Sequence, residues 1–144
     1  MTKKEKVIGV FHNDLNCAQS VLSVYGNEYG IDEKSAKAIA VGFGSGIGKT
    51  QQICGALTGA VMVLGAKYFD EDNAAESKEK VYTKTRELLN SFREKNGDCN
   101  CRNLLGIDIS TEEGLKLAHE KDVFNLKCKK YLSDVCDNLD KLLK

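Results

Sequence analysis

The sequence contains no proline, no surplus of charge of either sign and no hydrophobic run long enough to cross a membrane. Lysine and arginine together number 21, as do aspartate and glutamate. The chain therefore lacks the basic excess that is typical of nucleic-acid-binding proteins and of proteins held on anionic membranes. The longest apolar run covers residues 53–66, interrupted only by Thr58, whereas a bilayer span needs about 20 residues. We expect no nucleic-acid partner and no membrane insertion.

The amino terminus also lacks the pattern of a secretory signal. The start, Met1-Thr2-Lys3-Lys4, is charged, but no apolar stretch of signal-peptide length follows it. We therefore expect a cytoplasmic protein. Disulfide frameworks belong to oxidising compartments, so the cysteines of such a chain are expected to be free or bound to a metal.

Hydrophobic spacing predicts an all-α fold in a single domain over residues 1–144, a compact bundle of about five helices. The expected helices cover about residues 13–29, 32–43, 51–69, 74–95 and 126–143, with a short helix near 111–121 and one turn at 102–105. Asp32 is expected to cap the second helix, and Ser110 with Glu113 forms a predicted capping box for the short one. Residues 7–12 are expected to be a short extended segment.

Glycine recurs at every second position from Gly42 to Gly48, which predicts a loop before the third helix, because a regular helix tolerates such a run poorly. The segment 44–50 is similar to a phosphate-binding loop. The Walker pattern, however, needs glycine where Phe43 stands, and it follows a strand rather than a helix. We expect no nucleotide. Gly55 and Gly59 predict a helix face that a neighbouring helix or a ligand approaches closely.

Cysteine is the residue type that this chain has in excess. The six cysteines are Cys17, Cys54, Cys99, Cys101, Cys128 and Cys136. A single free cysteine usually serves as a small buried hydrophobe, but six in one chain of this kind indicate metal, cluster or thiol redox chemistry.

Several cysteines fall where helices are predicted to begin. Cys17, Cys54 and Cys128 lie near predicted helix amino termini, and Cys101 precedes a helical turn. Unpaired amides and a partial positive charge at such positions stabilise a thiolate or a negatively charged cluster.

The spacing of the cysteines excludes several known cysteine motifs. Apart from Cys99-x-Cys101, the cysteines are scattered singly. The sequence therefore lacks the paired spacing of zinc sites, the C-x-x-C of thioredoxins, ferredoxin runs and the C-x-x-C-H of haem attachment. Scattered thiols that converge could hold an iron–sulfur cluster or form exchangeable disulfides. His12 and His119 are isolated and are interpreted as surface or core residues, although His12 is near Cys17 and keeps a role as ligand or base open.

An ordered set of segments resembles the C-GCAxxG-C-C family of redox-active proteins over about residues 12–140. The segments are Asn16-Cys17-Ala18-Gln19, the glycine loop 42–48, the run Cys54-Gly55-Ala56-Leu57-Thr58-Gly59-Ala60, the run Cys101-Arg102-x-Leu104-x-Gly106, and Cys128. The resemblance implies that Cys17, Cys54, Cys101 and Cys128 are the shared cysteines.

The resemblance also implies a small cytoplasmic protein of bacteria or archaea, often of anaerobes. Similar domains are attached to some multihaem cytochromes, which favours electron transfer, although no haem carries over to this chain. The sequence departs from the family label at Ile53, where glycine would stand. Cys99 and Cys136 are additional, and Cys136 could replace Cys128 as the fourth cysteine.

We therefore expect the four shared cysteines to bind an iron–sulfur cluster for electron transfer with an unknown redox partner. Close backbone approach to the cluster is expected at Gly44, Gly46, Gly48 and Gly55. Two alternatives stay open: a thiol–disulfide oxidoreductase or redox sensor using Cys99 with Cys101 or Cys17 with Cys54, and a structural zinc site or helical interaction module. Any of these is compatible with a homodimer through the small-residue face of the third helix. Whether the chain is an enzyme is left open.

Overall fold

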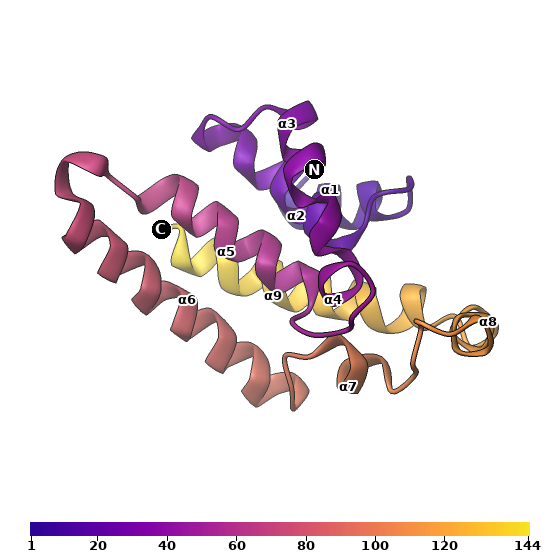
Figure 1. Cartoon of the computed structure of the whole chain (residues 1–144). Helices are drawn as coiled ribbons and strands as arrows, with labels where there is room; N and C mark the ends of the chain where they lie inside the picture. Colours follow the sequence, from indigo (N-terminus) through magenta and orange to yellow (C-terminus); the bar gives the residue numbers. More distant parts are fainter.

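The computed structural model describes all residues from Met1 to Lys144 and is an all-α bundle, as expected (Figure 1). Its helices are α1 (Lys3–Phe11), α2 (Cys17–Tyr25), α3 (Glu33–Ala40), α4 (Gly44–Ile47), α5 (Gly55–Tyr68), α6 (Ala74–Asn96), α7 (Cys101–Leu105), α8 (Glu112–Glu120) and α9 (Lys129–Leu142). Short 3₁₀ turns cover 26–29, 41–43 and 71–73, and a π-helical segment covers Phe124–Cys128. None of the helices combines the length and the apolarity that crossing a bilayer would require.

Helix α5 occupies the centre of the bundle and packs against α2, α6 and α9 (Figure 1). It is apolar on all sides and rich in alanine and glycine, which suits a helix surrounded by others. Gly59 explains the close approach of α2, because a Cβ at this position would lie 2.9 Å from the carbonyl oxygen of Ala18. The glycine face predicted from the sequence is therefore covered by a neighbouring helix of the same chain.

The expected extended segment at residues 7–12 is wrong, because residues 7–11 belong to α1 and His12 is its carboxyl-terminal cap. Thr2 and Glu5 form a capping box that starts this helix, and the face carrying Val7 is fully buried. The cap of α8 also differs from the prediction: Thr111, not Ser110, accepts from the backbone N–H of Gly114. Asp32 caps α3 as predicted, accepting from the backbone N–H of Ser35.

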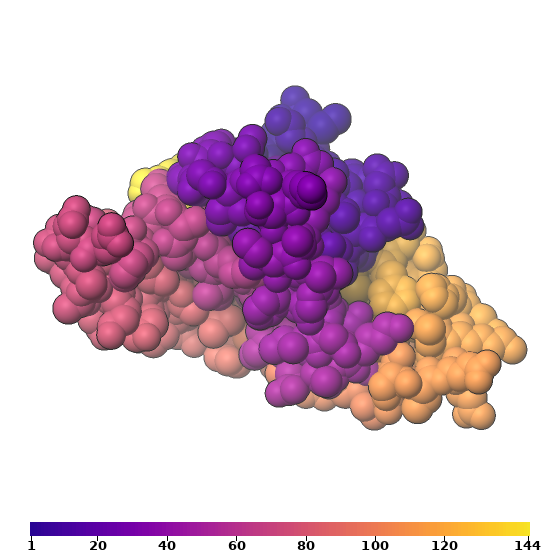
Figure 2. Space-filling view, turned by 45° about the horizontal axis from the view of Figure 1, so that its top comes forward, coloured from indigo at the N-terminus to yellow at the C-terminus, as the bar shows by residue number.

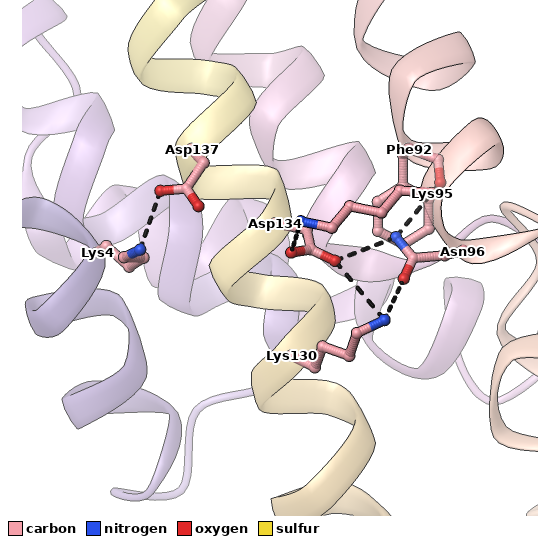
Figure 3. A network of polar contacts seen from close by, with 7 residues as sticks. All are labelled: Lys4, Phe92, Lys95, Asn96, Lys130, Asp134 and Asp137. Atoms are coloured by element: carbon pink, nitrogen blue, oxygen red, sulfur yellow. Dashed lines mark hydrogen bonds and ion pairs between the residues drawn. The ribbon is translucent and has the colours of Figure 1, made fainter.

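A polar network fixes α9 against α6 (Figure 3). The buried carboxylate of Asp134 on α9 pairs with Lys95 at 2.9 Å and accepts from the side-chain amide of Asn96 at 3.3 Å, both on α6. Lys130 donates to Asn96 at 2.9 Å. Because α9 continues directly from the segment that ends at Cys128, this network also fixes the position of that cysteine.

Candidate redox site

Four of the six cysteines line a single cavity of about 510 Å³. They come from four separate elements: Cys17 is the first residue of α2, Cys54 immediately precedes α5, Cys101 begins α7, and Cys128 ends the π-helical segment. Cys54, Cys101 and Cys128 are buried, and Cys17 is partly buried. The fold thus brings together the four cysteines that the family resemblance singled out.

Backbone pairing between two loops brings Cys54 next to Cys101. The Cys54 N–H donates to the carbonyl of Cys99 at 2.9 Å, and the Cys101 N–H donates to the carbonyl of Gln52 at 2.6 Å. An isolated antiparallel bridge joins Ile53 and Asn100 between these bonds. This short ladder determines the relative position of two of the four thiols.

The position of Cys17 depends on Asn16, the residue before it. Asn16 and Gln19 form a capping box at the start of α2, and the Asn16 side-chain amide donates to the carbonyl of Val41 at 2.9 Å. A Cβ on Gly44 would overlap the Asn16 side chain, so glycine is required there for packing. Asn16 therefore ties Cys17 to the glycine-rich segment.

Cys128 lies in an unusual stretch of backbone. The π-helical segment 124–128 runs into α9 without a break, and such wide turns occur frequently at functional sites. Two side chains attach this region to α7: the Lys127 ammonium donates to the carbonyl of Leu105 at 3.2 Å, and the Tyr131 hydroxyl donates to the carbonyl of Leu104 at 2.8 Å. These bonds attach the segment that carries Cys128 to the helix that begins at Cys101.

The thiols differ in their protonation. A hydrogen bond between Cys17 and Cys128 raises the pKa of Cys17 well above its usual value and lowers the pKa of Cys128, so the proton of this pair stays on Cys17. Burial raises the pKa of Cys54 to about 12, against the opposing effect of the Ala56 and Leu57 amides. Burial likewise raises the pKa of Cys101, to about 11. Any metal that these thiols bind must displace their protons.

The glycine-rich segment forms a turn of left-handed helix rather than an irregular loop. Residues 45–49 all have positive φ, including the non-glycine residues Ser45, Ile47 and Lys49. Of the four glycines expected near the site, Gly46 and Gly55 line the cavity, whereas Gly44 and Gly48 do not. A Cβ on Gly46 would lie 2.6 Å from the backbone nitrogen of Gln52, so this turn packs tightly on the residues that precede Cys54.

The two additional cysteines lie outside the cavity lining. The Cys99 thiol donates to the carbonyl of Leu89 at 3.6 Å. Cys136 is fully buried, and burial raises the pKa of its thiol to about 12. Cys128, rather than Cys136, is the cysteine of the carboxyl-terminal region that reaches the cavity.

Both histidines of the chain also line this cavity, together with Asp14 and Asp122. All four residues are exposed. The nearness of His12 to Cys17 is visible in the sequence, whereas His119 and Asp122 reach the cavity only through the fold. No three or more His, Cys, Asp or Glu side chains lie close enough together to hold a single metal ion.

The family described as "Putative redox-active protein (C_GCAxxG_C_C)" matches residues 15–142, which include all four cavity cysteines. No curated protein and no solved structure matches the chain.

Proposed function

The chain belongs to the C_GCAxxG_C_C family of redox-active proteins, and from this premise we propose that its four cavity cysteines bind an iron–sulfur cluster for electron transfer. The observation that supports the proposal most is that four thiols from four separate elements line one cavity. Thiolates are the usual ligands of such clusters, and a bound cluster supplies redox chemistry over a wide range of potentials.

The surroundings of the thiols fit this group. Cys17 and Cys54 stand at the amino-terminal ends of α2 and α5, where free amides and the helix dipole stabilise negative charge on sulfur. Three of the four cysteines are buried, and an apolar shell that limits solvent access is one of the factors that set the potential of a cluster. The residues present therefore suit a negatively charged, thiolate-bound group.

The shared cavity of Cys17 and Cys128 favours a second candidate, thiol–disulfide exchange between them. Cys17 lowers the pKa of Cys128, which favours the thiolate that is the nucleophile in exchange. Attack of this thiolate on the disulfide of an oxidised partner would give a mixed disulfide, which Cys17 would resolve. The net change transfers two electrons and two protons to the partner, leaving one intramolecular disulfide.

We also propose that the protein works in the cytoplasm. A reducing cytoplasm would keep all six cysteines free, as they are here. We expect a redox partner that exchanges electrons with this site. The small-residue face of α5 packs on α2 within the chain, so a homodimer would form through another surface.

The test is the iron and acid-labile sulfide content, with a visible absorption spectrum, of protein purified without oxygen. Stoichiometric iron and sulfide with a charge-transfer band support the cluster. Iron-free protein with a thiol count that falls reversibly on oxidation supports the exchange mechanism instead. Stoichiometric zinc without redox activity contradicts both and indicates a structural site.

A further inference from the structure

Cys54 and Cys99 are hydrogen-bonded to each other through the backbone. The Cys54 N–H donates to the carbonyl oxygen of Cys99 at 2.9 Å, next to the antiparallel bridge that joins Ile53 to Asn100. The two cysteines are therefore directly opposite each other in this antiparallel pair, and directly opposite residues place their side chains on the same side of it. Here that side is the interior, because both cysteines are buried whereas Asn100 is exposed.

This spacing suits a disulfide. The Cα atoms of directly opposite residues in an antiparallel pair lie about 4.5–5.5 Å apart. A disulfide joins residues whose Cα atoms lie about 4.4–6.8 Å apart. Cys101 follows Cys99 by two residues and is therefore diagonal to Cys54, at about 7–8 Å. Backbone geometry thus favours Cys99 over Cys101 as the disulfide partner of Cys54.

Gln51 holds the two paired segments in register. Its backbone carbonyl accepts from the N–H of Arg102 at 3.0 Å, which adds one more bond to the pair. Gln51 is 4% exposed, and its side chain bonds to the loop after α7 at two places. The side-chain nitrogen donates to the carbonyl of Ile107 and the side-chain oxygen accepts from the N–H of Ile109, both at 2.8 Å. The positions of the two cysteine-bearing backbones are therefore fixed by contacts outside the pair itself.

The two thiols differ in how a small molecule reaches them. Cys54 lines the thiol cavity, and the segment that leads into it lies at the surface of the face seen in Figure 2. Cys99 is 2% exposed and does not line the cavity, and its thiol donates to the carbonyl of Leu89 at 3.6 Å. A thiol is a weak donor, so this bond is readily given up. A small oxidant therefore meets Cys54 first, and rotation of the Cys99 side chain away from Leu89 carries its sulfur toward Cys54.

We propose that Cys54 and Cys99 form a disulfide site, in which Cys99 withdraws Cys54 from the thiol cavity under oxidising conditions. The disulfide itself follows from the backbone pairing of the two residues. Its consequence for iron rests on the proposed cluster-binding function, because Cys54 bonded to Cys99 has no thiolate left to ligate a cluster. Cys99, which the cavity leaves out, thereby acts as a reversible block on the site.

Hydrogen peroxide is the oxidant of the proposed reaction. Its O–O bond breaks as the Cys54 sulfur takes one oxygen to give a sulfenic acid, and the other oxygen leaves as water. The Cys99 sulfur then attacks the Cys54 sulfur, which forms the S–S bond and releases a second water. Overall, two thiols lose two electrons and two protons, and one peroxide becomes two waters. Burial raises the pKa of both thiols, so the first step is expected to be slow at neutral pH.

Peptide mapping tests the disulfide directly and does not depend on iron. Reduced, metal-free protein is treated with hydrogen peroxide, its remaining thiols are alkylated, and the chain is digested with trypsin. Cys54 then lies on the peptide 50–67, whereas Cys99 and Cys101 share the peptide 96–102. We expect these two peptides to be cross-linked in the wild-type protein and in Cys101→Ala. The cross-link should be lost in Cys99→Ala.

Cys136→Ala is the matched control, because Cys136 is also a buried cysteine outside the cavity lining. This variant should keep the cross-link between the two peptides. Wild-type protein in which Cys54 is linked to Cys17 or Cys128 instead would overturn the inference. So would a cross-link between the two peptides that survives in Cys99→Ala and is lost in Cys101→Ala.

Iron uptake tests the consequence for the site. Peroxide-treated protein is supplied with iron and sulfide without oxygen, and the cross-linked fraction is mapped in the same sample. We expect iron bound per chain to fall as that fraction rises, and to recover when dithiothreitol reduces the disulfide. Reduced protein that takes up no iron would contradict the proposed function, and the peptide map would still decide the disulfide. Cross-linked protein that binds as much iron as reduced protein would overturn the role assigned to Cys99.

Discussion

Cys54, Cys101 and Cys136 are thiols whose pKa values burial raises to about 12, 11 and 12. In the unfolded chain they should titrate near the usual thiol value of about 8.5. At a pH between the unfolded and the folded pKa values, the folded chain retains thiol protons that the unfolded chain has released. The free energy of unfolding of the metal-free protein is therefore expected to fall as pH rises above about 8.5.

Denaturant unfolding at a series of pH values, under reducing conditions and without metal, measures this dependence. Below the thiol pKa of the unfolded chain, the three thiols are protonated in both the folded and the unfolded state. They therefore make no contribution to the pH dependence of the free energy of unfolding there. Cys136→Ala should make the decline shallower, because it removes one of the three groups. A stability that stays constant across this range would show that the thiols are not shielded from solvent as the fold indicates.

Ile47 is a β-branched residue with φ +72°, a conformation that sterically disfavours such side chains. It is 43% exposed, so shortening its side chain loses little buried surface. Ile47→Gly is therefore expected to raise the free energy of unfolding by up to about 1 kcal/mol. Ile39, which is exposed in the right-handed helix α3, is the control: Ile39→Gly should lower stability. Loss of stability in both variants would contradict the left-handed turn.

At the scale of elements, the contact between α2 and α5 depends on Gly59. Gly59→Ala is expected to reduce the free energy of unfolding by about 1–3 kcal/mol, because the added Cβ meets the backbone of Ala18 at 2.9 Å. Gly65→Ala is the matched control in the same helix, since a Cβ there meets nothing within 4 Å. The control should be neutral or stabilising by up to about 1 kcal/mol. Denaturant unfolding measures both, and equal effects would contradict this packing.

The longer helices could be predicted from the sequence because their apolar residues repeat with the helical period and their caps are local. Helix α1 was missed because the apolar run at residues 7–12 has no clear helical period, while the capping box that starts the helix, Thr2 with Glu5, lies before it. The π-helical segment at Cys128 has no recognisable sequence pattern. Its contacts with α7, through Lys127 and Tyr131, join residues that are more than 20 positions apart in the sequence.

The sequence motif selected four cysteines that the fold brings to one cavity, but only two of the four glycines expected there, Gly46 and Gly55, line that cavity. The four cavity cysteines were selected by their resemblance to the family, and the fold brings them to one cavity. Gln51 and His119 carry no local signal, since their positions depend on contacts with segments far away in the sequence. His12 differs, because it lies close to Cys17 in the sequence. Gln51 lies in a region that reads as a helix start, although its side chain bonds to Ile107 and Ile109.

At the scale of the whole molecule, the central claim is that the chain folds so that Cys17, Cys54, Cys101 and Cys128 hold one cluster, with Cys99 and Cys136 left out. The most direct test compares iron bound per chain in six single cysteine-to-alanine variants purified without oxygen. We expect each of the four cavity variants to lose most of its iron, and Cys99→Ala and Cys136→Ala to keep the wild-type content. Equal loss across all six, or loss in Cys136→Ala with retention in Cys128→Ala, would contradict the account.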